Sequence, residues 1–514
     1  MKLSALLTQA GWASNGDAGL AQDEGVSVHG ASDAQVTGFA IDHRKVAPGT
    51  VFGAFRGARF NAEDVIPAAI DAGALAVVSL PGVAVDGAVH ITSEQPRRTF
   101  ARIAARFFTP SPDVIVAVTG TNGKTSTAEM TRQIWRMCGE RAASIGTLGV
   151  TTPDGSISTG LTTPDIVTFL SNMSGLAREG VTHVAYEASS HGLDQFRNEG
   201  LRVGAGAFTN FSRDHLDYHG TMDEYFAAKM RLFDEVVDDG GAAVIWAGAE
   251  DSPWSQRAVE HASRRGLSVR TVGEKGDFLR LTARAASQLG QTLTIEYDGA
   301  SYTVQLPLIG AYQTANALVA AGLALATGAP RAGVFDALSR LQPVRGRLER
   351  ACLTQVGAPV YVDYAHTPDA LDAAIAALRP HVNAQNGGRL IAVFGAGGDR
   401  DTGKRAPMGA VAARAADYAI VTDDNPRGEE AGAIRAAILA GAGGAPHMRA
   451  IAGRREAISA AIAMANANDI ILIAGKGHEQ GQIIGSGDTM KILPFDDVDV
   501  ARECAAHSAK GMSS

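Results

Sequence analysis

A short glycine-rich turn, Gly-Thr-Asn-Gly-Lys-Thr at 120–125, carries residues suited to phosphate chemistry. It separates the apolar run 114–118 from a predicted helix. The two glycines let the backbone approach an anion, which backbone N–H groups and the helix dipole then face. Lys124 would reach the β- and γ-phosphates of a nucleotide, and the Thr125 hydroxyl would bind Mg²⁺. The order of strand, turn, lysine and helix predicts a phosphate-binding loop; a chance glycine turn before a helix is the alternative.

A carboxylate ends the next apolar run, His-Val-Ala-Tyr-Glu at 183–187, and Ala-Ser-Ser-His-Gly follows it. Glu187 beside a phosphate loop would suit Mg²⁺, which prefers oxygen ligands and substrate phosphates. Two other interpretations stay open. Ser189 or Ser190 could cap a helix, with His191 merely packed against it. The same residues resemble a nucleophile elbow, which would make Ser190 the nucleophile of a serine hydrolase, although that class has no use for a phosphate loop.

The segment 209–233 is dense in polar side chains. A predicted strand ends at Asn210, a loop with several acids and histidines follows, and a helix is expected to begin near residue 221. Lys229 lies on this helix. A lone helical lysine is usually solvated, and a lone histidine such as His215 is usually packed, so residue type alone assigns neither of them a role.

The stretch Asp-Asp-Asn-Pro-Arg at 423–427 ends the apolar run 418–422 abruptly. Pro426 removes one backbone donor and holds Asn425 outside the helical region. A carboxylate, an amide and a guanidinium are thereby held rigidly at the end of a buried strand, where α/β sheets bind ligands. The alternative for Arg427 is a surface ion pair with one of the two glutamates that follow it.

These polar groups follow short apolar runs that alternate with helical patterns, which predicts parallel strands with crossover helices. We therefore expect an α/β protein of three domains: a small N-terminal α/β domain at 1–110, a central domain with a mostly parallel sheet at 111–343, and a C-terminal Rossmann-like α/β domain at 344–514. Two prolines at 109–113 mark the first linker. Strands are expected at 35–41, 50–55, 74–79, 88–92, 114–118, 183–187, 205–210, 242–246, 360–364, 390–395, 418–422 and 469–474.

The bulk composition excludes several classes of protein. With 514 residues, of which 46% are apolar and 19% charged, the chain can form several buried cores. Its net charge of -8 argues against bulk nucleic-acid binding. The cysteines Cys138, Cys352 and Cys504 are too few and too widely spaced for a disulfide framework, and they fit a reducing cytoplasm. We find no signal peptide and no apolar stretch of about 18 residues, so no membrane insertion is expected.

Taken together, these stretches resemble the Mur ligases, the ATP-dependent amino-acid-adding enzymes of bacterial cell-wall synthesis. The resemblance implies that the first domain binds the UDP end of the substrate, the second binds ATP and the third binds the incoming amino acid. The matching stretches, in the family's order, are GTNGKT (120–125), LTTPD (161–165), EASSHGLDQFR (187–197), TNFSRDHLDYHG (209–220), YFAAKMRLF (225–233), NALVAAG (316–322), GRLE (346–349), VDYAHTPDAL (362–371), GAGGDRDTGKR (395–405), DDNPR (423–427) and AGKGHE (474–479).

The resemblance also implies the nucleotide and metal sites. In the family, the lysine at the position of Lys229 carries a carbamate formed with CO₂, which turns a cation into an anion that can face Mg²⁺. The positions that match catalytic residues are Lys124, His215 and Lys229. The positions that match Mg²⁺ ligands are Thr125, Glu187, His215 and Lys229. The positions that match ATP contacts are Gly120, Thr121, Asn122, Gly123, Lys124, Thr125, Ser126, Asn316, Arg347 and Asp363.

A further set of positions matches the family's contacts to the UDP-muramoyl dipeptide. For the muramoyl dipeptide these are Thr162, Thr163, Ser189, Gln195 and Arg197. On the uracil side the matches are Ile41, His43 and the turn 58–60, and His43 stands where the family often has serine.

In the family members that add meso-diaminopimelate, an Asp-Asn-Pro-Arg stretch recognises the amino acid, whereas lysine-adding members carry another residue in place of the arginine. Diaminopimelate has one carboxylate more than lysine, and a planar guanidinium can hold a carboxylate with two parallel bonds. An empty site would leave Arg427 unpaired, which would reject lysine. The positions that match diaminopimelate contacts are Arg400, Asp424, Asn425, Pro426, Arg427, Gly475 and Glu479.

The resemblance implies that a D-glutamyl γ-carboxylate attacks ATP to give an acyl phosphate, which the amine of meso-diaminopimelate converts into an amide. We expect a cytoplasmic monomer that binds these small molecules but no nucleic acid, and closure of the third domain over the second to exclude water. The alternatives are a lysine-adding Mur ligase, a ligase like folylpolyglutamate synthase, a nucleotide-binding dehydrogenase suggested by the glycines at 395–398, and a non-catalytic nucleotide switch.

Overall fold

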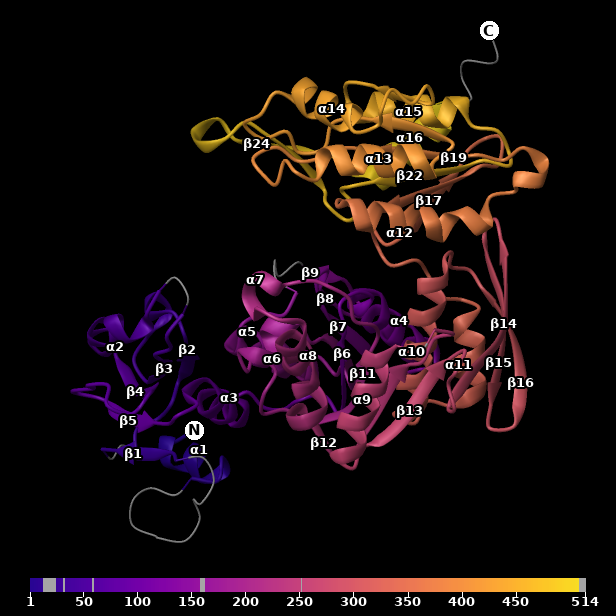
Figure 1. Ribbon diagram of the computed structural model, residues 1–514. Coiled ribbons are helices and arrows are strands. Elements are labelled where there is room, and N and C mark those ends of the chain that lie inside the picture. Colours follow the sequence, from indigo (N-terminus) through magenta and orange to yellow (C-terminus); the bar gives the residue numbers. More distant parts are fainter. Residues whose placement is uncertain (13–24, 31–32, 58–59, 158–161, 251, 508–514) are drawn as a thin grey trace. The chain divides into compact units, whose positions relative to one another are not determined.

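The computed structural model describes residues 1–12, 25–30, 33–57, 60–157, 162–250 and 252–507. The chain forms two compact units, one of residues 1–272 with 322–330 and the other of residues 273–321 with 331–514. Both units consist of sheets flanked by helices, so the predicted α/β class is confirmed (Figure 1). The three-domain division at residues 110 and 343 stays a prediction.

A small sheet with helices forms the first part of unit one. Its elements are α1 (Leu3–Gln9), β1 (Ser27–His29), β2 (Gly38–Ala40), β3 (Thr50–Gly53), α2 (Ile66–Asp71), β4 (Ala74–Ser79), β5 (Val89–Thr92) and α3 (Pro96–Phe107). The strand order is β1–β5–β4–β3–β2, and only β1 is antiparallel to its neighbour. Because side chains alternate between the faces of a strand, Val51 and Val78 contact one hydrophobic cluster and Phe52 and Val77 contact another.

A larger sheet follows in the same unit. Its elements are β6 (Val114–Thr119), α4 (Lys124–Met137), β7 (Ala142–Gly146), β8 (Gly149–Thr151), β9 (Ser156–Ile157), α5 (Ile166–Arg178), β10 (His183–Glu187), α6 (Ser190–Asp194), β11 (Val203–Phe208), α7 (Leu216–His219), α8 (Met222–Arg231), β12 (Val237–Trp246), α9 (Pro253–Arg264) and β13 (Ser268–Gly273). The order is β13–β12–β11–β6–β10–β7–β8–β9. The strands from β13 to β7 are parallel, and β8 and β9 are antiparallel additions. The parallel arrangement of β6, β10, β11 and β12 was predicted, whereas β7 and β13 were not among the expected strands.

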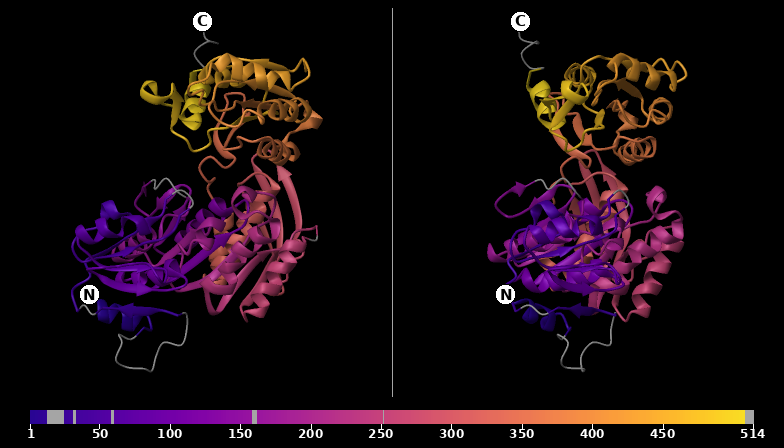
Figure 2. Two further views of the ribbon diagram at one scale, coloured as in Figure 1. Left: turned by 60° about the vertical axis from the view of Figure 1, so that its left-hand side comes forward. Right: turned by 90° about the vertical axis from the view of Figure 1, so that its left-hand side faces the viewer.

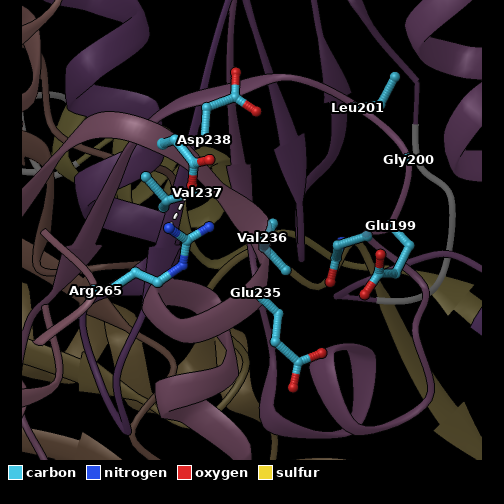
Figure 3. Close-up of a pocket in the computed structure, with 10 residues that line it drawn as sticks. Glu199, Gly200, Leu201, Glu235, Val236, Val237, Asp238 and Arg265 are labelled. Atoms are coloured by element: carbon cyan, nitrogen blue, oxygen red, sulfur yellow. Dashed lines mark ion pairs between the residues drawn. The ribbon is translucent and has the colours of Figure 1, made fainter. Parts of the chain in front are cut away.

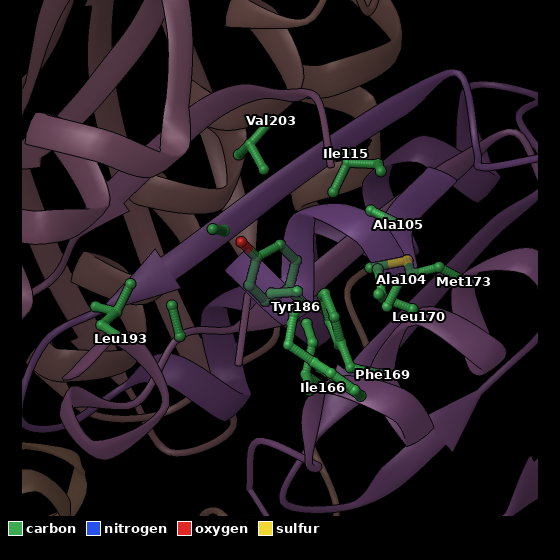
Figure 4. Close-up of a cluster of buried hydrophobic side chains, with 14 of the residues drawn as sticks. Ala104, Ala105, Ile115, Ile166, Phe169, Leu170, Met173, Tyr186, Leu193 and Val203 are labelled. Carbon is green, nitrogen blue, oxygen red and sulfur yellow. The ribbon is translucent and has the colours of Figure 1, made fainter. Parts of the chain in front are cut away.

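The core beneath β10 joins the strand to two helices (Figure 4). Tyr186 of β10 packs edge-on against Phe169 of α5, with ring centroids 5.0 Å apart. Met173 of α5 and Ala104 of α3 belong to the same buried cluster. This close packing fixes β10, and with it the polar residues that follow Glu187.

Unit two begins with an antiparallel sheet that the sequence did not predict. It comprises β14 (Leu279–Ser287), β15 (Gly290–Tyr297) and β16 (Ala300–Leu306). Helices α10 (Ala311–Ala326) and α11 (Arg331–Leu338) follow in the chain. Among the described residues, no helix has the length and apolar composition needed to cross a membrane.

The rest of unit two is a doubly covered sheet. Its strands are β17 (Glu349–Leu353), β18 (Pro359–Asp363), β19 (Leu390–Phe394), β20 (Tyr418–Val421), β21 (Met448–Ala450) and β22 (Ile470–Ala474), in the order β17–β18–β22–β19–β20–β21. All neighbours are parallel except β17 and β18. The remaining elements are α12 (Pro368–Leu378), α13 (Arg405–Ala415), α14 (Ala431–Ala440), α15 (Arg454–Met464), β23 (Gly481–Ile484), β24 (Lys491–Pro494) and α16 (Asp497–His507).

Two hydrophobic clusters cover the two faces of this sheet. Helices α12, α13 and α14 contribute to one cluster, and α15 and α16 contribute to the other. The orange and yellow ribbon of this part of the chain is seen from two further sides in Figure 2. The buried parallel strands are therefore apolar throughout, which is why their runs were visible in the sequence. Their polar continuations all lie at the carboxyl end of the sheet.

Candidate active site

The turn at 120–125 lies between β6 and α4, as the sequence predicts. Gly120 and Gly123 adopt φ angles of 143° and 84°, which favour glycine. A Cβ at position 120 would lie 2.0 Å from the Thr209 hydroxyl oxygen, so a larger residue does not fit. Because α4 begins at Lys124, the N–H groups of its first turn point toward the loop, and a helix N-terminus of this kind favours an anion.

Residues that follow β11 hold this phosphate loop in place. The Asn122 N–H donates to Asn210 Oδ1 at 2.9 Å, and the Thr209 hydroxyl donates to the Asn122 carbonyl at 2.6 Å. The Thr121 N–H donates to the Asn210 carbonyl at 2.9 Å. These partners meet because β11 lies beside β6 in the sheet. These hydrogen bonds within the protein therefore fix the conformation of the loop.

Two lysine side chains meet at the Gly120 carbonyl oxygen. Lys124 Nζ donates to this oxygen at 3.0 Å and to the Thr121 carbonyl at 2.8 Å, while Lys229 Nζ donates to the Gly120 oxygen at 2.7 Å. Lys229 is 1% exposed. Burial, and then the charge of Lys124, holds the pKa of Lys229 well below its usual range. The solvated interpretation of this helical lysine is therefore wrong.

The start of α8 explains why Lys229 points inward. Thr221 and Glu224 form a reciprocal capping box, so the helix begins at the predicted position. Tyr225 and Lys229 are one helical turn apart and both are buried. Lys229 Nζ lies 4.4 Å from the centroid of the Tyr225 ring. The cap thus fixes which face of α8 carries the lysine to the phosphate loop.

Glu187 ends β10 directly beside the phosphate loop, since it pairs in register with Val118 of β6. Its side chain is buried and accepts from the Thr147 N–H at 2.6 Å and from the Thr147 hydroxyl at 3.3 Å. A Cβ at Gly146 would lie 2.0 Å from Glu187 Oε1, so glycine leaves room for the carboxylate. Thr147 was not predicted as a site residue.

His215 lies in a group of aromatic and histidine rings. Its ring centroid is 5.0 Å from that of His191 and 5.9 Å from that of Tyr225, the residue that also contacts Lys229. Its φ angle is 51°, and its side chain is 45% exposed. In the described part of the chain, no three His, Cys, Asp or Glu side chains converge as for a metal cage. Mg²⁺ in nucleotide sites commonly has one or two protein ligands, with phosphates and waters completing the shell.

The positions predicted for the muramoyl dipeptide form one hydrogen-bonded group. The Thr163 hydroxyl donates to the Glu187 carbonyl at 2.9 Å and to Ser189 Oγ at 3.0 Å, and Arg197 donates to the Thr163 carbonyl at 3.0 Å. Arg197 also donates twice to Gln195 Oε1. These hydrogen bonds bring residues from the segments 162–163 and 189–197 together near the end of β10.

The serines of this group have structural partners. Ser189 caps α6 by accepting from the Gly192 N–H at 3.0 Å, so the helix-cap interpretation is confirmed for this residue. Ser190 is 2% exposed, which does not suit the nucleophile of a hydrolase. Thr162 accepts from the Thr147 hydroxyl at 3.1 Å, so Thr147 connects Thr162 with Glu187.

The uracil-side positions lie after β2 in the small sheet. Ile41 is partly buried against the hydrophobic core, and His43 begins a short 3-10 helix at His43–Lys45. Asp42 caps this turn and pairs with Arg44, which lowers the pKa of Asp42 to about 2. Within the turn 58–60, residues 58 and 59 lie outside the described range.

Three predicted ATP contacts belong to unit two. Gln313 of α10 accepts from Asn316 Nδ2 at 3.3 Å and donates to the Arg347 carbonyl at 2.8 Å, which connects these two positions. Asp363 ends β18 and accepts from the Leu348 N–H at 2.8 Å. Burial raises the pKa of Asp363. Gln313 was not predicted as a site residue.

The predicted amino-acid site forms where three neighbouring parallel strands end. Gly475 and Glu479 follow β22, Arg400 follows β19, and the stretch 424–427 follows β20. Gly475 has a φ angle of 122°, and a Cβ there would lie 2.6 Å from Asp424 Oδ2. Arg400 is exposed at this edge.

Arg427 is held from both its backbone and its side chain. Its φ angle is 51°, unusual for a residue other than glycine. Its N–H donates to the Ile483 carbonyl at 3.1 Å, and its carbonyl accepts from the Gly485 N–H at 2.8 Å. One guanidinium nitrogen donates to the Gly398 carbonyl at 2.9 Å. Arg427 therefore pairs with Ile484 of β23 as in a parallel sheet, and this pairing fixes the orientation of its backbone.

The surface ion-pair interpretation of Arg427 is wrong. Glu429 accepts from Arg405 at 2.8 Å, and Glu430 caps α14. Asn425 is 4% exposed and donates to Glu479 Oε2 at 3.0 Å. The rigid setting that Pro426 predicts is therefore present, with Arg427 directed to the Gly398 loop.

Comparison with known proteins identifies the family. Residues 118–324 match the Mur ligase middle domain, and residues 346–477 match the Mur ligase glutamate ligase domain. A relative from Zymomonas mobilis subsp. mobilis, a UDP-N-acetylmuramoyl-L-alanyl-D-glutamate–2,6-diaminopimelate ligase, is 60% identical over 92% of this chain and 95% of its own length. The chain belongs to the Mur ligase family. A Bradyrhizobium diazoefficiens relative of the same name is 52% identical over 90% of this chain and 93% of its own length.

Solved structures agree with this assignment to the Mur ligases. A structure of UDP-N-acetylmuramoyl-L-alanyl-D-glutamate–2,6-diaminopimelate ligase is 32% identical, with a TM-score of 0.72 over 93% of this chain and 97% of that one. Folylpolyglutamate synthase of Mycobacterium tuberculosis, complexed with ADP, is similar in fold alone, with 20% identity and a TM-score of 0.58 over 74% of this chain and 91% of that one. The family prediction is confirmed, and the chain is an ATP-dependent, amide-forming ligase.

A separate cavity of about 230 Å³ lies in unit one of this Mur ligase, lined by residues 198–201, 235–239 and Arg265 (Figure 3). Its wall is rich in acids, but each acid has an arginine partner. The pairs are Glu199 with Arg98, Glu235 with Arg231, Asp238 with Arg202 and Asp239 with Arg265. The wall is therefore electrically balanced, which gives a charged ligand no advantage.

Proposed function

We propose that this Mur ligase joins meso-diaminopimelate to the γ-carboxylate of the D-glutamyl residue of UDP-N-acetylmuramoyl-L-alanyl-D-glutamate, with ATP converted to ADP and phosphate, in the cytoplasmic synthesis of peptidoglycan precursors. The observation that carries the choice of amino acid is Arg427. Its guanidinium donates to the Gly398 carbonyl at 2.9 Å, and Arg427 itself lies where the neighbouring strands β19, β20 and β22 end. Two relatives named for this substrate, at 60% and 52% identity, support the same choice.

The first step is phosphoryl transfer. An oxygen of the γ-carboxylate attacks the γ-phosphorus of ATP, the bond to the β,γ-bridging oxygen breaks, and ADP leaves with that electron pair. Lys124 and the N–H groups at the start of α4 offset the charge that gathers on the phosphoryl oxygens. The Lys124 side chain lies directly on this loop, where its Nζ donates to the Gly120 and Thr121 carbonyls.

The donors around the loop fit Mg²⁺. Thr125 offers a hydroxyl, Glu187 a carboxylate at the end of the neighbouring strand, and His215 an imidazole across the Tyr225 ring. Mg²⁺, which members of this family use, would supply charge neutralisation on the phosphates at these residues. The residues around the phosphate loop would orient the attacking carboxylate oxygen and the leaving β,γ-bridging oxygen.

Lys229 fits the carbamate that the family carries at this position. Only a neutral amine reacts with CO₂, and burial lowers the pKa of Lys229 so that the neutral form is favoured. In its charged form Lys229 would be a second cation close to Lys124, which also disfavours that form. A carbamate on Lys229 would supply an anion there and turn this repulsion into attraction.

The second step forms the amide. The lone pair of the diaminopimelate amine attacks the acyl carbon, the C–O bond to phosphate breaks, and phosphate leaves with the electron pair while the nitrogen loses a proton. Arg427 and Arg400 would bind the carboxylates of the amino acid, and Glu479 would bind an ammonium group. Thr162, Thr163, Ser189, Gln195 and Arg197 would hold the muramoyl dipeptide, and Asn316, Arg347 and Asp363 would contact the nucleotide.

The test is release of phosphate from ATP by the purified chain with the UDP-muramoyl dipeptide and one amino acid. We expect release and a new amide with meso-diaminopimelate, and at least about a hundredfold lower kcat/KM with L-lysine. Omission of the dipeptide is the control. Equal use of both amino acids would refute the assigned substrate, and no release with either would refute the reaction.

A further inference from the structure

Lys476 is a fully buried lysine next to the proposed amino-acid site. It follows β22, and its side chain is 0% exposed. Lysine is rarely buried to this degree without partners. Its Nζ donates to Asn425 Oδ1 at 2.9 Å and lies 3.5 Å from Glu479 Oε2. The buried charge therefore contacts two side chains proposed to bind diaminopimelate.

The three side chains form a closed triangle, because Asn425 Nδ2 also donates to Glu479 Oε2 at 3.0 Å. The Ile483 N–H donates to Asn425 Oδ1 at 2.9 Å. Two donors on Oδ1 and one acceptor on Nδ2 fix the orientation of the Asn425 amide. They also hold Oε2 of the Glu479 carboxylate on the protein side.

Electrostatics agrees with this arrangement. Burial lowers the pKa of Lys476, while the Asp424 and Glu479 carboxylates act in the opposite direction. The lysine therefore depends on these neighbours for its charge, and they depend on it for their position. Glu479 itself is 36% exposed, so its side chain is also accessible from solvent.

We propose that Lys476 is a positioning residue for the amino-acid substrate: its buried Nζ holds the Glu479 carboxylate and the Asn425 amide in the one arrangement that receives the substrate's ammonium group. This inference rests on the proposed function. Lys476 acts through Glu479 and Asn425 and does not itself touch the reacting atoms. Its removal therefore weakens binding of the amino acid and leaves the phosphoryl transfer to the dipeptide intact.

The test is Lys476→Met, which fills the same space without a donor. We expect KM for meso-diaminopimelate to rise about tenfold to a hundredfold, since a hydrogen bond to a charged group is lost. We expect kcat and KM for ATP to stay within about threefold. Arg389→Met is the matched control, because it breaks an ion pair with Asp469 at the opposite end of β19 and β22. It should lower thermal stability without changing KM for diaminopimelate.

A double-mutant cycle with Glu479→Gln separates positioning from general destabilisation. If Lys476 acts through Glu479, its substitution adds little to the KM of the Glu479→Gln enzyme. Fully additive effects, or an unchanged KM in the single variant, would overturn the inference. If Lys476→Met does not fold, Lys476→Gln is carried through the same cycle. Failure of the wild-type enzyme to couple diaminopimelate would instead refute the proposed function.

Discussion

Replacement of Arg427 by lysine tests the amino-acid site most directly. The substitution keeps the positive charge and tolerates the backbone φ angle of 51°, which arginine and lysine adopt at similar cost. It removes the planar fork, of which one nitrogen donates to the Gly398 carbonyl while the others would bind a substrate carboxylate under the proposed function. One charge-assisted hydrogen bond is then lost, about 1.5–3 kcal/mol, which lowers kcat/KM for meso-diaminopimelate about 12-fold to 150-fold.

The assay is ADP release at saturating ATP and UDP-muramoyl dipeptide, measured in separate reactions with meso-diaminopimelate and with L-lysine. Activity with L-lysine should change far less, so the ratio of the two kcat/KM values narrows. Arg414→Lys, an exposed arginine of α13 paired with Asp372, is the matched control and should behave like wild type. A kcat/KM for diaminopimelate within about threefold of wild type, in a variant of unchanged melting temperature, would refute the two-pronged recognition.

Three further predictions concern other parts of the chain. Gly120→Ala should weaken ATP binding at least about tenfold and lower the free energy of unfolding by about 1–3 kcal/mol, because the new Cβ would lie 2.0 Å from the Thr209 hydroxyl. Calorimetric titration and urea unfolding measure the two effects. Gly175→Ala, in open space inside α5, is the control and should leave ATP binding unchanged without lowering the free energy of unfolding. Thr147→Val should lower kcat about threefold to tenfold, since the hydroxyl that connects Glu187 with Thr162 is lost. Thr147→Ser keeps a hydroxyl and should have the wild-type kcat. A wild-type kcat in the valine variant would contradict a role of this hydroxyl in catalysis. His381 is buried and neutral, with Nε2 accepting from the Gly310 N–H and Nδ1 donating to the Ser287 carbonyl, and burial lowers its pKa below 6.5. Below pH 6.5 the unfolded state binds a proton that the folded state does not, so stability present above pH 6.5 is lost as pH falls toward the lowered pKa of His381. In urea unfolding, His381→Gln should reduce this decrease of the free energy of unfolding with falling pH. An unchanged decrease would show that other groups cause it.

The sequence revealed the parallel strands because these strands are buried on both faces. The runs 74–79 and 183–187 coincide with β4 and β10, since each is apolar and ends at a polar residue. Strands β14 to β16 escaped prediction because much of their surface is exposed and their composition is mixed. A continuous apolar run in the sequence indicates a strand that is buried on both faces. Antiparallel strands with one exposed face have a mixed composition, so their hydrophobic pattern is weaker.

The site was predictable where a polar residue follows a buried parallel strand, as Glu187 and Arg427 do. The burial of Lys229 could not be derived from its own residue type, because it depends on the capping box of α8 and on the loop it faces. Thr147 follows β7 at the same sheet edge, but the run 142–146 was not among the expected strands, so the residues after it were not searched. Gln313 and Lys476 act through contacts between segments distant in sequence, which no local pattern encodes.

The left-handed backbone at Arg427 has a consequence for transferring specificity between relatives. That conformation is supported by Ile483 and Gly485, which lie in and after β23, more than fifty positions along the chain. A graft of Asp-Asn-Pro-Arg alone into a lysine-adding enzyme would carry the side chain without the strand that aims it. Hairpin β23–β24 has to be transferred together with the four residues, so this selectivity depends on two segments of the chain rather than on a single motif.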